Sequence, residues 1–251
     1  MGSVSVEVVS SLLNNCTQSD FSENVEADFH LNHPRYRALK RMSGRILDIG
    51  SGDGGIGQLI GWPVRLTGKS LVGCDLDQMF PLPNFYTDWI SGGWERVSKS
   101  EKFGGIFVIH VIEHLVAWRE MLSFAVSVLK DDEFLYIEWP VNKSVSWPTA
   151  SEIWLNFTKH QPKFSNQLLS TFNFYDDGSH VDRPPTMEEV LTHLSGVQII
   201  ESGPIRLQDF SAELVSKGLK EQSVSSVTLG IWAEFGFAQF VLAQKRNTHS
   251  E

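Results

Sequence analysis

Residues 45–57 have the sequence RILDIGSGDGGIG, and the rest of the chain is organised around them. The apolar, partly β-branched residues Ile46, Leu47 and Ile49 predict a strand that is buried on both faces of a parallel sheet. The glycines that follow allow a tight turn with positive φ and let a ligand lie against the backbone amides. A helix predicted over residues 56–60 would direct its N-terminal amides at the same ligand. The stretch therefore predicts a strand, a ligand-binding turn and a helix.

Two kinds of cofactor fit this glycine-rich turn. Gly50, Gly52 and Gly55 have the spacing of the dinucleotide fingerprint. The GxGxG pattern of residues 50–54, which follows Asp48, fits a nucleoside-binding turn instead. A carboxylate in this place repels a pyrophosphate, whereas it attracts an ammonium or a sulfonium. A glycine-rich connection that binds no ligand is the third possibility.

Composition and charge place the chain among globular α/β proteins. It has 251 residues, which is enough for one large domain, and its net charge of −9 does not indicate a nucleic-acid surface. Its two cysteines, Cys16 and Cys74, lack a metal-binding spacing and favour a reducing cytoplasm over a disulfide framework. The first residues do not resemble a secretory signal, and the longest apolar block, 106–112, is too short to span a membrane. We therefore expect a cytoplasmic protein that binds neither membrane nor nucleic acid.

The pattern of polarity predicts how the chain is divided. Residues 1–34 are expected to form a lead-in or lid, residues 35–245 the main domain, and residues 246–251 a tail. Within the main domain, residues 141–182 are rich in aromatic side chains and too long for a simple connection. We interpret them as an inserted cap over a substrate, although a second hydrophobic cluster without a substrate role would have the same composition.

Acidic residues close the second and third predicted strands. Residues 70–75 form a strand that ends in Asp75, whose carboxylate can accept hydrogen bonds from a ribose diol or can cap the next turn. Residues 84–88 predict a short strand that ends in Asp88. The Asp88 carboxylate can accept a hydrogen bond from an adenine amino group while Trp89 packs on the adenine ring. It can equally be an acid on the protein surface.

Polar residues also follow the buried strand predicted at 105–109. His110, Glu113 and His114 come at its carboxyl end, where open α/β sheets bind ligands. Glu113 can also cap the helix predicted at 115–129. Two adjacent candidate metal ligands without a third do not indicate a metal site, so we expect none.

The remaining part of the chain alternates between strands and helices. Thr186 is predicted to cap one of these helices. The predicted elements are strands at 134–139 and 197–201, a helix within 30–42 that begins near Pro34, helices at 184–194 and 209–219, and a long β-rich stretch at 227–244.

These pieces together resemble the class I S-adenosylmethionine-dependent methyltransferases, of the group that acts mostly on small molecules. The resemblance covers residues 35 to 245 and rests on segments in a characteristic order: ILDIGSGDG, LVGCDLD, FGGIFVIHVIEHL, LKDDEFLYIEWP and SHVDRPPTMEEVLTHLSG. Gly104 stands where an acid is common, and Asp131 and Asp132 replace a glycine-rich turn. The family fold would be α/β and Rossmann-like: a seven-stranded, mostly parallel sheet with helices on both faces and an inserted cap. Its last, antiparallel strand would come from residues 232–244.

The resemblance implies in-line transfer of a methyl group from S-adenosyl-L-methionine to an oxygen or nitrogen of a small-molecule acceptor. The acceptor's proton would need a base near neutrality, and the candidates are His110, His114 and, preferred because it follows the aromatic insertion, His180. A non-catalytic binding or regulatory protein and an NAD(P)-dependent oxidoreductase are the alternatives. The implied cofactor-binding residues are Asp48, Gly50, Ser51, Gly52, Gly54, Asp75, Leu76, Asp88, Trp89 and His110.

Overall fold

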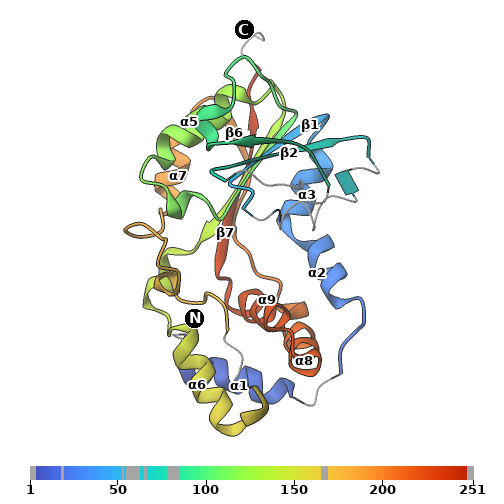
Figure 1. The fold of residues 1–251 in the computed structure, drawn as a ribbon, viewed down its shortest axis with the longest axis vertical. Coiled ribbons are helices and arrows are strands. Elements are labelled where there is room, and N and C mark those ends of the chain that lie inside the picture. Colours follow the sequence, from blue (N-terminus) through green and yellow to red (C-terminus); the bar gives the residue numbers. More distant parts are fainter. Residues whose placement is uncertain are drawn as a thin grey trace. The chain divides into compact units, whose positions relative to one another are not determined.

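A computed structural model of the protein describes residues 4–17, 20–52, 54, 63–64, 67–77, 85–164 and 169–247. The chain divides into two units, each built from three separate segments (Figure 1). The sheet unit comprises Pro34–Trp139, Pro185–Gly203 and Gln239–Glu251. The helical unit comprises Met1–His33, Pro140–Pro184 and Pro204–Ala238. The helix predicted at residues 56–60, with Gly55, lies outside the described residues.

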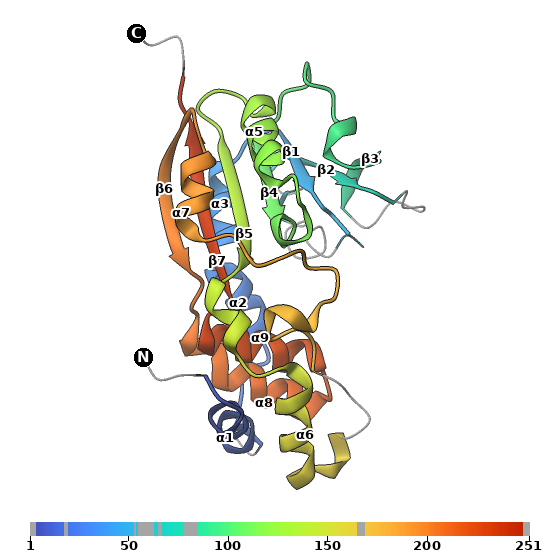
Figure 2. The same cartoon turned by 90° about the vertical axis from the view of Figure 1, so that its left-hand side faces the viewer.

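A seven-stranded sheet forms the centre of the sheet unit, in the order β3-β2-β1-β4-β5-β7-β6 (Figure 2). Its strands are β1 (Arg45–Ile49), β2 (Ser70–Asp75), β3 (Tyr86–Ser91), β4 (Gly105–Ile109), β5 (Phe134–Pro140), β6 (Val197–Pro204) and β7 (Ala238–Lys245). The first five strands along the chain pair in parallel.

β7 runs antiparallel to β5. At one end the Lys245 amide donates to the Glu133 carbonyl, and at the other end the Val141 amide donates to the Phe237 carbonyl. The residue numbers of the two strands therefore run in opposite directions, and the sheet is mixed. Seven strands, mostly parallel with an antiparallel last strand, are what the resemblance implies, so the predicted fold class is confirmed.

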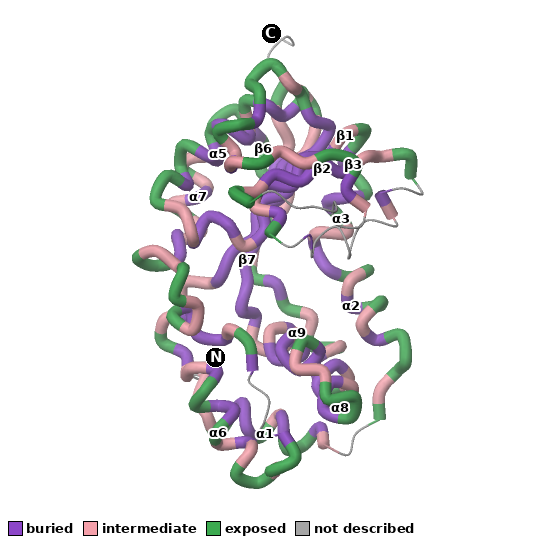
Figure 3. The backbone as a smooth tube through the Cα atoms, viewed as in Figure 1, coloured by how far each residue is buried: buried purple, intermediate pink, exposed green. Residues whose placement is uncertain are grey.

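Helices cover both faces of this sheet. α5 (Trp118–Val128) and α7 (Met187–His193) share one core with the odd-numbered residues of β5, such as Ile137 and Trp139. α3 (Pro34–Arg41) contacts the even-numbered residue Glu138, which points to the opposite face. The short helices η1 (Trp94–Arg96) and η2 (Ile112–His114) follow β3 and β4. β1, β2 and β4 are buried along most of their length, as a strand covered on both faces requires (Figure 3).

The helical unit has a core of its own. Its helices are α1 (Val6–Cys16), α2 (Val25–Asn32), α6 (Ala150–His160), α8 (Ser211–Glu221) and α9 (Val224–Phe235), with the short helices η3 (Asn142–Ser146), η4 (Pro162–Phe164), η5 (Phe174–Asp176) and η6 (Gln208–Phe210). Aromatic side chains of residues 141–182, including Trp154, Phe157 and Phe172, pack with apolar side chains of α1, α8 and α9. Much of the aromatic content of this segment therefore builds a hydrophobic core.

Two local predictions were wrong. Residues 227–244 were predicted to be β-rich, but their first half, residues 227–235, belongs to α9. Gly236 ends this helix at φ +70°, and β7 follows. An apolar run that is buried on most sides does not show by its periodicity whether it is a helix or a strand. The third strand lies at Tyr86–Ser91, later than predicted. Within the described ranges, no helix combines the length and apolar character needed to cross a membrane.

Candidate functional site

The turn after β1 is shaped by glycines that no other residue can replace without strain. Gly50 has φ +75°, and a Cβ atom placed on it would lie 2.2 Å from Cγ2 of Val111. Gly52 has φ +53°, and its amide donates to Oδ2 of Asp75 at 2.7 Å. Ser51 is buried; its Oγ donates to the Asp48 carbonyl and accepts from the Cys74 amide, which ties the turn to the end of β2. Ser51 therefore holds the turn in place.

A cavity of about 340 Å³ opens beside this turn, at the carboxyl ends of β1, β2 and β4. Its described lining residues come from the turn after β1, the end of β2, η1 and the segment after β4. They are Ile49, Gly50, Gly52, Cys74, Asp75, Leu76, Gly93, Trp94, Glu95, His110, Val111, His114 and Leu115. Parallel sheets of this kind bind ligands at this edge.

Asp75 presents its carboxylate at the cavity from the last position of β2. Its Oδ2 accepts from the Gly52 amide and its Oδ1 from the Leu76 amide, each at 2.7 Å. Its carbonyl accepts from the amides of Gly92 and Gly93 at 2.9 and 3.3 Å. These bonds fix the side chain at the cavity edge and leave its remaining lone pairs for a ligand. Leu76 beside it is 76% exposed and also lines the cavity.

Asp48 is 1% exposed, below the turn. The Tyr86 hydroxyl donates to its Oδ2. Burial raises the pKa of Asp48 to about 7; the Tyr86 hydrogen bond opposes this shift, whereas the charge of Asp75 adds to it. At neutral pH the protonated and ionised forms of the Asp48 carboxyl group are therefore both populated. A cation bound nearby would favour the ionised form.

His110 is held between two carboxylates. It adopts φ +54°, unusual for a residue other than glycine, and lines the cavity. Its Nδ1 lies 3.0 Å from Oε1 of Glu113, and its Nε2 lies 3.3 Å from Oε1 of Glu138. Burial lowers the pKa of His110, but the interactions with Glu113 and Glu138 outweigh burial and raise it to about 9. The imidazole is therefore a cation at neutral pH, which argues against the predicted role of His110 as a base.

The other two candidate bases lie in different units. His114 lines the same cavity as His110. His180 belongs to the helical unit, where its ring stacks on Phe174 with the ring centroids 4.3 Å apart. Its Nδ1 lies within hydrogen-bonding distance of the Phe174 carbonyl, and because a carbonyl only accepts, Nδ1 carries the proton. In the neutral ring the basic lone pair of His180 is then at Nε2.

The structure does not bring Asp88 and Trp89 to the cavity. Asp88 is exposed and pairs with Arg45 at 2.7 Å, Nη2 to Oδ2. The Trp89 ring packs against Gly73, where a Cβ atom would come within 2.3 Å of the ring. Both residues were placed at a strand end because the boundary of β3 was predicted too early.

η1 supplies the residues that the sequence reasoning missed. Gly93, Trp94 and Glu95 line the cavity directly after β3. The signal for them is the pair Gly92–Gly93, both with positive φ, which turns the chain back over the end of β2. Such a glycine pair after a strand was visible in the sequence.

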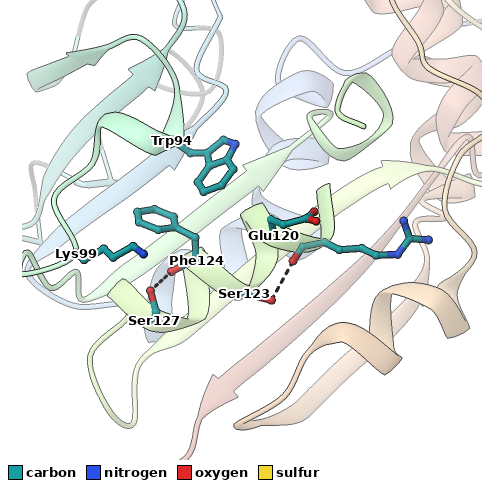
Figure 4. Close-up of a pocket in the computed structure, with 7 residues that line it drawn as sticks. Trp94, Lys99, Glu120, Ser123, Phe124 and Ser127 are labelled. Carbon is teal, nitrogen blue, oxygen red and sulfur yellow. Dashed lines mark hydrogen bonds between the residues drawn. The ribbon is translucent and has the colours of Figure 1, made fainter. Parts of the chain in front are cut away.

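Trp94 also borders a second, more open cavity, of about 590 Å³ (Figure 4). The indole faces the Phe124 ring of α5, with centroids 5.3 Å apart. The residues that line this outer cavity are Trp94, Lys99, Arg119, Glu120, Ser123, Phe124 and Ser127. Trp94 is thus shared by the two cavities.

Comparison with known families agrees with this geometry. Residues 21–176 match the model of a family described as a methyltransferase domain. The match covers more than half of the chain, so the chain belongs to this methyltransferase family. The family, the enzyme class and the S-adenosylmethionine cofactor predicted from the sequence are confirmed. No curated protein matches the sequence.

Solved structures share the fold at low sequence identity. A putative methyltransferase of Haloferax volcanii, solved with the activator Trm112, is 12% identical, with 90% of this chain and 93% of that chain covered and a TM-score of 0.53. The plantazolicin methyltransferase BpumL is 14% identical, with 96% and 90% covered and a TM-score of 0.53. Coclaurine N-methyltransferase is 11% identical, with 96% and 87% covered and a TM-score of 0.51.

Proposed function

We propose that the protein transfers a methyl group from S-adenosylmethionine to an oxygen or nitrogen atom of a small-molecule acceptor. The observation that supports it most is the Asp75 carboxylate, which the amides of Gly52 and Leu76 hold at the edge of the cavity beside the glycine turn. When bound, the cofactor supplies an electrophilic methyl group on a positively charged sulfur.

The described residues fit this cofactor. The space that a Cβ atom of Gly50 would occupy is already filled by Val111, so the backbone itself forms the wall. Asp75 is held by backbone amides in a place suited to a ribose diol. Leu115 and Trp94 give the same cavity apolar surface for a nucleobase. Three acids at or beside the cavity, Asp48, Asp75 and Glu95, disfavour a pyrophosphate and hence the NAD(P) alternative.

We propose that a group other than His110 removes the acceptor's proton. His114 lines the same cavity, and the role of His180 as a base stays a prediction from the sequence. His110 already carries a proton at neutral pH between its two carboxylates and therefore cannot accept another. Positioning of the reactants supplies the larger share of the acceleration in such a displacement, up to roughly 7–11 kcal/mol.

The acceptor class is proposed from the fold relatives. Coclaurine N-methyltransferase was solved with N-methylheliamine, and BpumL with an analogue of desmethylplantazolicin. Both ligands are small organic molecules, and we extend this class of acceptor to the present chain.

Calorimetric titration of the wild-type protein and of Asp75→Ala tests the cofactor assignment. We expect wild-type protein to bind S-adenosylmethionine and S-adenosylhomocysteine but not NAD. Because charge-assisted hydrogen bonds are worth about 1.5–3 kcal/mol each, loss of the Asp75 carboxylate should weaken binding by about 100-fold. Asp77→Ala is the matched control, since this acid lies two residues further on and outside the cavity lining. Binding of NAD alone would contradict the proposal.

Turnover separates the enzyme from its non-catalytic alternative. Small-molecule phenols, carboxylic acids and amines are offered with S-adenosylmethionine, and release of S-adenosylhomocysteine is measured. Release that depends on an acceptor supports transfer. Tight cofactor binding without turnover of any of these acceptors favours a binding or regulatory protein.

Trp94 gives a second test of the cavity. Trp94→Leu removes the indole that lines both cavities, and we expect about a 10-fold loss of affinity for S-adenosylhomocysteine because apolar contact area is lost. Ser123→Ala alters only the outer cavity and should change this affinity by less than about twofold. Equal effects of the two variants, measured by calorimetry, would show that the nucleobase does not contact Trp94.

A further inference from the structure

The outer cavity beside Trp94 lies between two walls that come from different parts of the sheet unit. One wall is a face of α5, where Arg119, Ser123 and Ser127 stand four residues apart and therefore in a row. Because helical residues rise about 1.5 Å each, this row extends about 12 Å. The other wall, with Trp94 and Lys99, comes from η1 and the segment after it (Figure 4). The volume of about 590 Å³ is in the range of pockets that take small organic ligands.

Two aromatic rings give the outer cavity a flat apolar surface. Phe124 is buried and packs against Trp94, with the ring centroids 5.3 Å apart and the ring planes inclined by 46°. Trp94 is half-buried, so part of its indole stays accessible to a ligand. Large aromatic side chains stack favourably with other planar rings. The cavity therefore fits a planar aromatic ring.

Two cations line the same cavity without an acidic partner. The guanidinium carbon of Arg119 lies 4.3 Å from the centroid of the Trp118 ring, a contact that leaves its N–H groups available as donors. Across the residues that the structure describes, neither Lys99 nor Arg119 forms an ion pair. Glu120 is the one acid among the described lining residues, so the cavity is positive, whereas the whole chain has a net charge of −9.

A neighbouring lysine performs the structural role that Lys99 could otherwise have. The ammonium group of Lys102 donates to the Ser127 carbonyl and thereby satisfies the C-terminal end of α5. Lys99 lies three residues earlier and lines the cavity instead. Its charge is therefore available to a ligand.

We propose that the outer cavity is a second ligand site, which takes a planar aromatic carboxylate with its ring against Trp94 and its acid group attracted by Lys99 and Arg119. Lysine and arginine bind ionised acids through charge-assisted hydrogen bonds. The site is separate from the cavity beside the glycine turn, although Trp94 lines both. It goes beyond the proposed function and does not depend on it.

Calorimetric titration with 2-naphthoate tests the class of ligand, and 2-naphthamide, which has the same rings without the charge, is the matched probe. We expect wild-type protein to bind 2-naphthoate about 10-fold more tightly than 2-naphthamide. Lys99→Gln and Arg119→Gln should each weaken binding of 2-naphthoate by about threefold, and the double variant by about 10-fold, because each removes one exposed charge.

Two controls accompany these variants. Binding of 2-naphthamide should change by less than about twofold in all of them, which excludes a folding defect as the cause. Arg96→Gln removes an exposed cation of η1 that is not among the described lining residues, and it should change the affinity for 2-naphthoate by less than about twofold.

Nuclear magnetic resonance locates the bound probe. The indole N–H signal of Trp94, assigned by its loss in Trp94→Leu, should shift as 2-naphthoate is added. The titration is then repeated with S-adenosylhomocysteine at saturation. We expect 2-naphthoate still to bind and to shift this signal, because it occupies the outer cavity.

The outcomes separate this inference from the proposed function. The second site is overturned by a lack of saturable 2-naphthoate binding at millimolar concentration, by equal affinity for the two probes, or by equal losses in Arg96→Gln and Lys99→Gln. Loss of 2-naphthoate binding at saturating S-adenosylhomocysteine would place the probe in the cavity beside the glycine turn and would also overturn it. If wild-type protein binds 2-naphthoate as expected but not S-adenosylhomocysteine, the proposed function fails and the second site stands.

Discussion

Asp48→Asn is expected to make the folded protein more stable at about pH 8 while weakening its affinity for S-adenosylmethionine. Burial raises the pKa of Asp48 to about 7, so the folded state keeps a proton that the unfolded chain releases near pH 4. The free energy of unfolding therefore falls as pH rises from about 4 to 7 and stays low above that range. Raising the pKa of Asp48 by about three pH units lowers the free energy of unfolding above pH 7 by roughly 4 kcal/mol at most. We expect the Asp48→Asn variant to regain about 1–3 kcal/mol of this loss.

Urea unfolding at two pH values measures this effect. The gain of Asp48→Asn over wild type should be present at about pH 8 and small at about pH 4.5, where Asp48 is protonated in the folded state. Asp88→Asn is the matched control, because this acid is exposed and pairs with Arg45 at the surface; it should change stability by less than about 1 kcal/mol. A loss of stability in Asp48→Asn at pH 8 would contradict the prediction, because it would show that the folded state stabilises the ionised carboxylate and does not raise its pKa.

The same substitution should weaken cofactor binding. An ionised carboxylate below the turn attracts a positively charged ligand, and asparagine does not. We expect affinity for S-adenosylmethionine to fall by about 10-fold or more, which corresponds to about 1.4 kcal/mol. Stability and affinity would then change in opposite directions, which is typical of a residue retained for function.

Gly50→Ala is expected to destabilise the protein by about 2–4 kcal/mol and to abolish measurable cofactor binding. The new methyl group would lie 2.2 Å from Cγ2 of Val111, and alanine would have to adopt φ +75°. Since Val111 also lines the cavity, relief of this clash has to move the cavity wall. Urea unfolding and calorimetry with S-adenosylhomocysteine measure the two effects.

Gly52→Ala separates the clash from the backbone strain. Gly52 also has positive φ, but nothing lies within 4 Å of the point that a Cβ atom on it would occupy, so we expect a loss of only about 1 kcal/mol. The double variant Gly50→Ala/Val111→Ala removes the clash. Its loss in the free energy of unfolding should therefore be smaller than the sum of the losses in the two single variants. Equal losses for the two glycine substitutions would show that contact with Val111 is unimportant.

The strands and the centre of the site could be predicted because their signals are local. Leu47 and Val72 stand in short apolar runs that are buried on both faces, and each run ends where polar residues begin. The carboxyl ends of neighbouring parallel strands meet at one edge, so Gly50, Asp75 and His110 could be expected in one cavity.

The parts that were missed depend on contacts without a local signal. Arg35 and Glu138 are 103 positions apart, and no periodicity links them. The protonation of His110 follows from its two carboxylate partners, whereas the sequence showed only a histidine at a strand end. Asp88 was assigned to the cofactor because β3 is an edge strand with a mostly exposed pattern, which hides its boundaries.

The position of β7 has a consequence for how the protein is made. This strand is the last in the described chain, yet it lies inside the sheet, between β5 and β6. While the polypeptide leaves the ribosome, β5 therefore presents an unpaired edge until residues 238–245 emerge, and unpaired edges promote association between nascent chains. In the helical unit, Leu13 of α1 shares a core with Val215 and Ile231, which are translated some two hundred residues later. Until then this side chain lacks these core partners. Chaperone occupancy of the growing chain should accordingly persist until residues 238–245 have left the ribosome.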